Sequence, residues 1–155
     1  MNPKTLQQKI SRLLDRQKLA VLSTCGGNGP YASLVAFHYT SDLRCIYFAT
    51  TRATRKYANL MHQPQVAFLI DSRANREEDF HRAEAVTVIG RAEEFAEQEK
   101  QSAAASYLSR HPYLLEFIEA PTTAFFAVRT ENYIYVSNFQ EVFELRIDHA
   151  LSTSP

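Results

Sequence analysis

The chain has 155 residues, of which 45% are hydrophobic and 22% charged, proportions that are typical of a soluble globular protein and exclude disordered and fibrous classes. Lys plus Arg and Asp plus Glu each number 17, so the net charge of +0 argues against a nucleic-acid partner or a polybasic membrane contact. No run approaches the roughly 18 apolar residues of a membrane helix, and the polar N-terminal segment lacks the apolar core of a signal peptide, so a cytoplasmic location is expected.

A single domain over residues 1–155 is expected, and it begins with a helix at about residues 3–16. Asn2 can cap this helix, and Pro3 suits its first turn. The apolar residues recur at helical spacing and form one stripe: Leu6, Ile10, Leu13 and Leu14. We expect this stripe to cover an opening of a barrel that spans about residues 19–147.

Apolar, aromatic and β-branched runs between turn signals predict seven strands and a short eighth. They span Leu19–Thr24, Tyr31–Tyr39, Cys45–Thr50, Gln65–Ile70, Ala85–Ile89, Thr123–Val128, Tyr133–Val136 and Val142–Ile147. Helices are predicted at Thr54–His62 and Glu94–Arg110. The short connections favour antiparallel pairing, so we expect an α+β, mainly β, fold of the barrel type.

Glycines and charged residues mark the connections between these elements. The glycine-rich segment Gly26–Pro30 predicts a hairpin turn. Gly90 marks a bend or bulge at the end of its strand. The highly charged segment Asp71–Arg82 is expected to be a mobile loop, and Ser152–Pro155 a frayed tail.

Several reactive or aromatic side chains have a structural interpretation. Cys25 and Cys45 lie in apolar, strand-like surroundings and are expected to be buried free thiols. Neither cysteine belongs to a CxxC pair, and the five histidines are scattered, so no metal site is predicted. Tyr133, Tyr135 and Phe139 alternate and are expected in a barrel core or a dimer interface, in preference to contact with a partner's cofactor.

The most informative segment runs from Thr50 at the end of a strand into a helix that begins at an Arg–Lys pair. Free N–H groups and the positive end of the helix dipole favour an anion at such a position. Thr50, Thr51 and Thr54 can donate hydroxyl hydrogen bonds. Arg55 can grip two phosphate oxygens, and Lys56 adds a point charge. A phosphate site and a solvated helix start that Thr54 merely caps explain this pattern equally well.

Six short segments follow one another in a recognisable order: Pro30–Phe37, Ile46–Thr50, Thr54–Lys56, Asn59–Leu60, Pro64–Ala67 and Ala85–Ala92. In order and spacing they resemble the pyridoxamine 5′-phosphate oxidase-like superfamily of FMN-binding split-barrel proteins. The resemblance implies a six-stranded antiparallel Greek-key split β-barrel with peripheral helices. It also implies a homodimer with FMN at the interface.

The resemblance further implies two groups of FMN-contacting positions. The first holds the phosphate and the adjoining ribityl chain: Thr50, Thr51, Thr54, Arg55 and Lys56. The second lies along the isoalloxazine ring: Ser33, Leu34, Val35 and His38, of which His38 stands near the place of a flavin-contacting lysine.

The C-terminal part of the chain departs from the vitamin B6 oxidases. The chain has no tryptophan, and the segment Phe143–His149 does not reproduce their arginine and histidine substrate clamp. Pyridoxamine phosphate is therefore not the expected substrate. We expect an FMN-dependent oxidoreductase that moves hydride or electrons to or from another small molecule. Three alternatives stay open: a haem-binding or haem-degrading relative, a non-catalytic flavin or redox sensor, and a deazaflavin-dependent reductase.

Overall fold

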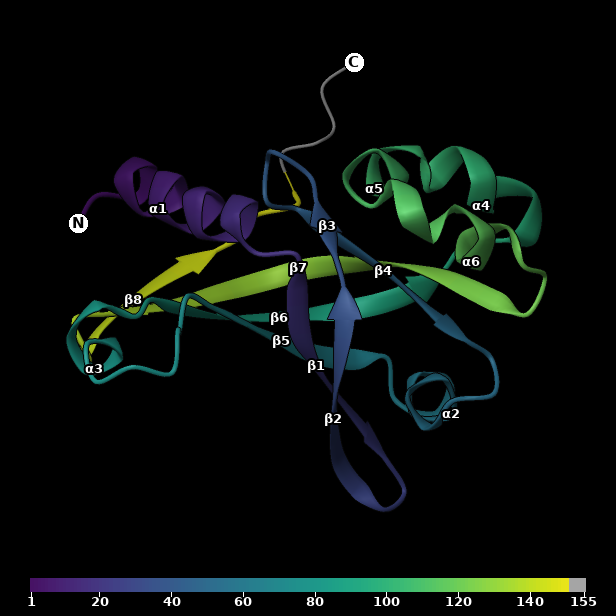
Figure 1. Cartoon of the computed structure of the whole chain (residues 1–155), viewed down its shortest axis with the longest axis horizontal. Coiled ribbons are helices and arrows are strands. Elements are labelled where there is room, and N and C mark those ends of the chain that lie inside the picture. The colour runs from purple at the N-terminus through teal and green to yellow at the C-terminus, as the bar shows by residue number, and fades with distance from the viewer. Residues whose placement is uncertain (151–155) are drawn as a thin grey trace.

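The computed structural model describes residues 1–150, so the tail predicted at Ser152–Pro155 lies outside the described residues (Figure 1). Eight strands in the described part form one antiparallel sheet, in the order β2-β1-β5-β6-β7-β4-β3, with β8 paired to β7. The strands are β1 Leu19–Gly26, β2 Gly29–Ala36, β3 His38–Tyr39, β4 Cys45–Thr51, β5 Gln65–Asp71, β6 Ala85–Glu94, β7 Thr123–Ser137 and β8 Glu141–Arg146. The fold is therefore α+β and mainly β, as predicted.

The chain itself closes this sheet into a split barrel. Strands β2 and β3 stand at the two ends of the strand order, yet only Phe37 separates them in sequence. Because one residue spans at most about 3.6 Å, the sheet must curl until its two ends lie side by side. We call this junction, Ala36 to His38, the seam. At the seam the chain stops pairing with β1 and begins pairing with β4.

Helices cover the barrel at several places (Figure 1). They are α1 Pro3–Arg16, α2 Arg55–His62, α3 Asp79–Arg82, α4 Glu97–Ala103, α5 Ala105–Arg110, the 3-10 helix η1 Pro112–Leu114 and α6 Leu115–Glu119. The predicted first helix is confirmed, since the Asn2 side chain accepts a hydrogen bond from the Thr5 amide and the apolar stripe is buried. None of the helices among residues 1–150 is long and apolar enough to cross a membrane.

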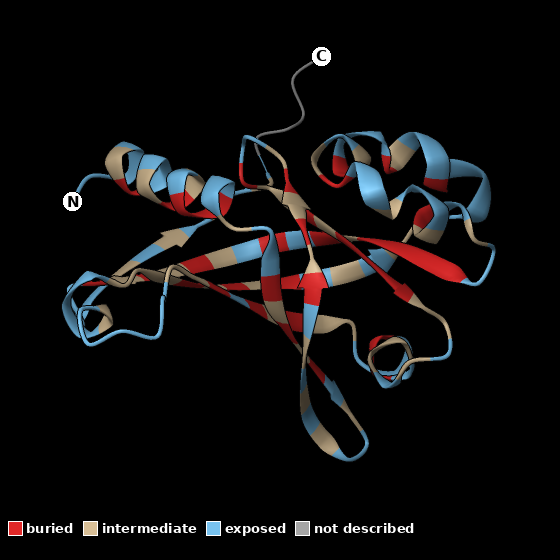
Figure 2. Ribbon diagram, in the orientation of Figure 1, coloured by how far each residue is buried: buried red, intermediate tan, exposed pale blue. Residues whose placement is uncertain are grey.

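The core divides into two clusters, one inside the barrel and one outside it. Figure 2 shows that the buried side of α1 faces the sheet. Inside the barrel, Phe48 stacks on Phe126 with ring centroids 5.1 Å apart. Outside, Ala49 and Phe125 pack under α4–α6 with Tyr107. Strands β4 and β7 are thus buried on both faces, because their successive side chains alternate between the two clusters.

Four of the predicted elements are divided or joined in the structure. The strand expected at Tyr31–Tyr39 is interrupted at Phe37, because the chain changes pairing partner there. The two strands expected at Thr123–Val128 and Tyr133–Val136 form one 15-residue strand, since the polar residues between them continue the ladder. The helix expected over Glu94–Arg110 begins only at Glu97 and is divided into α4 and α5 at Ala104. The two-residue β3 and the edge strand β8 bring the strands to eight, where the resemblance implied six.

The structure also tests the predictions for the glycine-rich turn, the charged segment and the two cysteines. Gly26 and Gly29 flank the predicted hairpin turn, which is confirmed. The segment expected to be a loop contains α3, and the Asp79 carboxylate organises it by accepting three backbone N–H bonds.

Both cysteines are free, but Cys25 is exposed and Cys45 is only half-buried, so the prediction of burial was wrong for Cys25. The reason is that Cys25 lies where the β1–β2 hairpin projects from the barrel.

The positions of Tyr133, Tyr135 and Phe139 follow from how far each side chain is buried. Tyr133 and Tyr135 are fully buried in the barrel core. The Tyr133 hydroxyl donates to the Leu43 carbonyl over 2.8 Å. Phe139, in the turn after β7, is 60% exposed and lies outside the core.

The bulge predicted at Gly90 is confirmed by a register shift between Ile89 and Gly90 and yields a first test. A Cβ at Gly90 would lie 2.6 Å from the Arg129 carbonyl oxygen. We therefore expect Gly90→Ala to lower the free energy of unfolding by about 1–3 kcal/mol, as measured by urea denaturation. Gly27→Ala is the matched control, because a Cβ there meets nothing within 4 Å. Equal unfolding midpoints for the two variants would contradict the steric argument.

Candidate functional site

A hollow of about 250 Å³ lies at the split of the barrel, where the end of β2 faces β4. Helices α2, α5 and α6 and the 3-10 helix η1 complete its walls. The lining residues are Leu34, Val35, Ala36, Ala49, Thr50, Thr51, Thr54, Lys56, Tyr107, Leu114 and Phe117. Three threonines and the lysine gather at the β4–α2 end, and the remaining walls are largely apolar. The hollow therefore offers a polar, cationic end and an apolar slot.

The structure brings six of the nine predicted site residues to this hollow: Leu34, Val35, Thr50, Thr51, Thr54 and Lys56. The other three do not line it. Arg55 is exposed, and its guanidinium lies over the Tyr31 ring, 5.2 Å from the centroid. The Ser33 hydroxyl is buried without a hydrogen-bond partner. His38 lies on β3 at the far end of the seam, where its backbone pairs with Tyr47.

The hydroxyls of Thr50 and Thr54 and the carbonyl of Thr51 form a compact cluster at the start of α2. Thr54 is the N-cap, and its Oγ1 accepts from the Tyr57 amide over 3.2 Å. Its hydroxyl also lies 2.8 Å from Thr50 Oγ1 and 3.0 Å from the Thr51 carbonyl. Thr54 thus caps the helix and holds the strand end against it. The first amides of α2 have no partner within the helix, as at any helix start, so the dipole favours an anion here.

Lys56 is the cationic group of the hollow. Its side chain is half-buried, and burial lowers the pKa of its ammonium group. None of the ion pairs among residues 1–150 involves Lys56. A partly buried cation without a carboxylate partner is unfavourable, and a bound anion would compensate its charge.

Contacts with β1 fix the position of α2 and hence of Lys56. The buried Asn59 amide donates to Thr24 Oγ1 over 3.0 Å. Gly26 allows this close approach, because a Cβ there would lie 2.1 Å from Asn59 Oδ1. The helix start is therefore held by a buried polar contact as well as by the cap.

Helix α5 supplies hydrogen bonds to the seam on the other side of the hollow. The Tyr107 hydroxyl donates to the Ala36 carbonyl over 3.2 Å. His111 Nε2 lies 2.7 Å from the Phe37 carbonyl and donates to it. His111 is fully buried, and its Nδ1 has no hydrogen-bond partner. Burial, together with the charge of Arg110, lowers the pKa of His111.

Three residues that complete the apolar wall were not predicted from the sequence: Tyr107, Leu114 and Phe117. These residues belong to the helical segment inserted between β6 and β7, and no local pattern marks them as site residues. Only the packing of the helices against Phe125 brings them to the hollow. A signal was available for His111 alone, as a histidine directly before a proline at a helix end.

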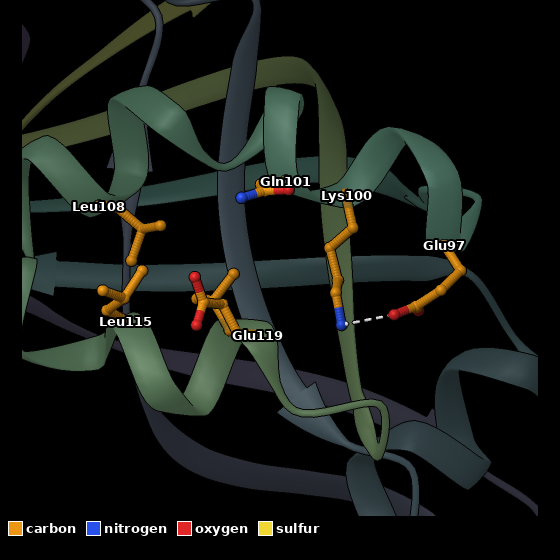
Figure 3. Close-up of a pocket in the computed structure, with 7 residues that line it drawn as sticks. Glu97, Lys100, Gln101, Leu108, Leu115 and Glu119 are labelled. Atoms are coloured by element: carbon orange, nitrogen blue, oxygen red, sulfur yellow. Dashed lines mark ion pairs between the residues drawn. The ribbon is translucent and has the colours of Figure 1, made fainter.

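A second hollow, of about 380 Å³, lies among α4, α5 and α6 (Figure 3). Its cation is Lys100, which is only 4% exposed. The Lys100 ammonium donates to the carbonyls of Ala120 and Thr123 over 3.0 and 3.1 Å, and it pairs with Glu97 at 3.0 Å. These three bonds use all of its N–H groups. Lys100 therefore ties α4 to the start of β7 and offers nothing to a ligand.

Metal ligands do not gather anywhere in the described part of the chain: no group of three His, Cys, Asp or Glu side chains could hold an ion. The polar groups at the β4–α2 junction are amides, hydroxyls and one ammonium group.

The half-buried His38 and the fully buried His111 predict how stability depends on pH. Burial lowers the pKa values of His38 and His111 below the ordinary value of about 6.5. The unfolded chain therefore binds more protons than the native protein at mildly acidic pH, and the free energy of unfolding should fall as the pH drops below 6.5. His111→Gln keeps an N–H donor but does not titrate, so its decline between pH 7 and 5 in urea denaturation should be smaller. The exposed His62→Gln is the control, and an equal decline for His111→Gln would refute this explanation.

Solved structures share this fold at low sequence identity. General stress protein 26 from Bacillus anthracis is 24% identical, with a TM-score of 0.67 over 92% of this chain and 98% of that chain. A heme-binding protein from Mycobacterium smegmatis is 17% identical, with a TM-score of 0.79 over 90% of this chain but only 57% of that chain. A FAD-binding protein from Mesorhizobium loti is 20% identical, with a TM-score of 0.63 over 83% and 90% of the two chains. These likenesses establish the fold.

A search of curated proteins found no match. The family model described as pyridoxamine 5′-phosphate oxidase matches residues 6–137. This range runs from within α1 to the end of β7 and contains every residue that lines the hollow at the barrel split. Since the match extends over most of the sequence, the chain belongs to the pyridoxamine 5′-phosphate oxidase family.

Proposed function

We propose that the hollow at the barrel split binds FMN and that the protein is an FMN-dependent oxidoreductase. The main support for this proposal is the half-buried Lys56, which forms no ion pair in the described residues and lines the hollow together with Thr50, Thr51 and Thr54. A phosphate monoester, with a charge near −2, suits this end of the hollow. The flat, largely apolar ring suits the slot between β2 and the wall formed by Leu114 and Phe117.

The residues present fit the cofactor at both ends. Three residues would hold the phosphate: Thr50, Thr54 and Lys56. The Arg55 guanidinium lies over the Tyr31 ring and would have to give up this contact to reach the phosphate. At the other end, the largely apolar lining, which includes Leu114 and Phe117, suits the ring. FMN, when bound, supplies the transfer of hydride or electrons. The chain itself binds the phosphate, orients the ring and excludes water.

The hollow of one chain is small for this cofactor. Its volume of about 250 Å³ lies below the roughly 300–1,000 Å³ of most small-molecule sites. A second copy of the chain, packed over the open side of the hollow, would complete the site. The proposed protein is therefore a homodimer with FMN at the interface.

The outer face of the sheet carries apolar side chains that suit such a dimer. Across the sheet, Val21 pairs in register with Leu34 on one side and with Leu69 on the other. Leu34 is 66% exposed and Leu69 38% exposed. The same row reaches Ile134 on β7 through Thr87. Contiguous exposed apolar surface is typical of subunit contacts, and Leu34 belongs both to this face and to the hollow.

Haem is the principal alternative ligand, because a heme-binding protein shares this fold. None of the residues lining the hollow is a histidine, whereas its cationic end suits a phosphate. We therefore favour FMN. Fluorescence titration of the purified protein with FMN should show saturable quenching. A Soret band on haem addition without any response to FMN would overturn the proposal, and tight FMN binding without turnover of reduced nicotinamide donors would identify a sensor.

Replacement of Lys56 tests the phosphate assignment. Lys56→Met keeps the length of the side chain but removes its charge, and losing a charge-assisted hydrogen bond should weaken FMN binding about 10- to 100-fold. Riboflavin, which lacks the phosphate, should bind the variant and the wild type equally. The exposed Lys4→Met serves as the control. Equal losses for FMN and riboflavin would place Lys56 away from the phosphate.

A charge on the outer face tests the dimer. Leu69→Lys should give a monomer in sedimentation velocity, because an apolar interface does not accommodate an unpaired ammonium group. The monomer should also bind FMN more weakly, since half of its site is lost. Leu115→Lys, at a 47% exposed leucine on α6, should leave the oligomeric state unchanged. A dimeric Leu69→Lys protein would contradict this interface.

A further inference from the structure

We infer that Tyr107 and His111 are positioning residues for the flavin ring, because their hydrogen bonds to Ala36 and Phe37 fix the strand end that forms one wall of the hollow. This inference rests on the proposed FMN site. It assigns to α5, which belongs to the helical segment between β6 and β7, a role in the geometry of the cofactor rather than in folding alone.

The backbone at the seam needs a hydrogen-bond donor from outside the sheet. Phe37 belongs to neither ladder, so its carbonyl has no sheet partner. A buried carbonyl without a hydrogen bond is strongly unfavourable. His111 supplies the missing donor from a fully buried position, at 2.7 Å. His111 therefore stabilises the backbone at the point where the chain crosses from one end of the sheet to the other.

A hydrogen bond also joins two walls of the hollow. Tyr107 and Ala36 both line the hollow, and the Tyr107 hydroxyl joins them directly. The Tyr107 ring is held in turn by Phe125, with centroids 5.3 Å apart, and by His111, with centroids 5.0 Å apart. The bond thus connects a rigid helical wall to the end of β2. Without it, the distance between these two walls would no longer be fixed.

A third contact shows that α5 is anchored independently of the hollow. The Arg110 guanidinium donates to the carbonyls of Leu14, Asp15 and Gln17 at the end of α1. It also lies over the Phe37 ring, 5.1 Å from the centroid. Tyr107, Arg110 and the C-cap residue His111 thus make their contacts from about one turn at the end of the six-residue helix α5. Because Arg110 still holds the helix, loss of the Tyr107 or His111 bond should move the strand end and leave the helix in position.

Removing a single hydroxyl provides the sharpest experiment. Tyr107→Phe keeps the ring contacts and removes only the bond to Ala36. We expect FMN to bind roughly three- to tenfold more weakly, as for the loss of one hydrogen bond, and the visible circular dichroism and reduction potential of the bound FMN to shift. Tyr113→Phe is the matched control, because Tyr113 is 69% exposed on the neighbouring turn. A purely structural role would change the unfolding midpoint and leave the flavin signals unchanged.

A rescue experiment tests His111 separately. His111→Leu removes the donor to Phe37, whereas His111→Gln can donate from its amide. We expect the leucine variant to shift the flavin spectrum as Tyr107→Phe does, and the glutamine variant to restore most of the wild-type spectrum and affinity. Variants that bind FMN with the wild-type affinity and spectrum would overturn this inference alone. A wild-type protein that does not bind FMN would overturn the proposed function and this inference together.

Discussion

Phe37 joins the two ends of an eight-stranded sheet, and the rest of the structure depends on this connection. One residue is too short to reach between the edges of an open sheet, so the sheet has to close on itself. Closure leaves a split beside β4, because β2 pairs with β1 and only the short β3 pairs with β4. The hollow lies at this split, and the hydrogen bonds from α5 satisfy the backbone where the ladders are interrupted.

Two lysines of the chain show how burial separates a structural group from a binding group. Lys100 is almost fully buried, and two carbonyls and Glu97 use all of its donors. Lys56 is half-buried at the hollow and has no acidic partner among the ion pairs of the described residues. A cation with satisfied bonds stabilises the fold, whereas one that lacks them gains most from an anionic ligand. This contrast supports the phosphate end of the proposed FMN site.

The strands of the sheet differ in whether one or both of their faces are covered. Strands β4 and β7 are covered on both faces, by the barrel core within and by α4–α6 outside. Strands β1, β2 and β5 are covered only within, and their outer faces carry leucine and valine in register. A second copy of the chain is the covering that this arrangement favours. Since the hollow opens beside the same face at Leu34, cofactor binding and dimer formation are expected to be coupled.

Local signals in the sequence determined much of this protein. The caps at Asn2 and Thr54, the hairpin at Gly26–Pro30 and the bulge at Gly90 follow from the preferences of a few neighbouring residues, and the sequence predicted each of them. It also predicted that a strand end and a helix start would form a cationic, hydroxyl-rich site.

Tertiary structure alone decided the features that depend on distant contacts. These are the interruption at Phe37, the turning of Arg55 onto Tyr31, and the placing of Tyr107 and His111 at the seam. At the seam, residues about 70 positions apart in the sequence come into contact because the barrel closes. Periodicity and turn signals within a short stretch of sequence cannot predict such a contact. The sequence could name the polar end of the hollow, which is built from consecutive residues, but the opposite wall exists only once the helices pack against the sheet.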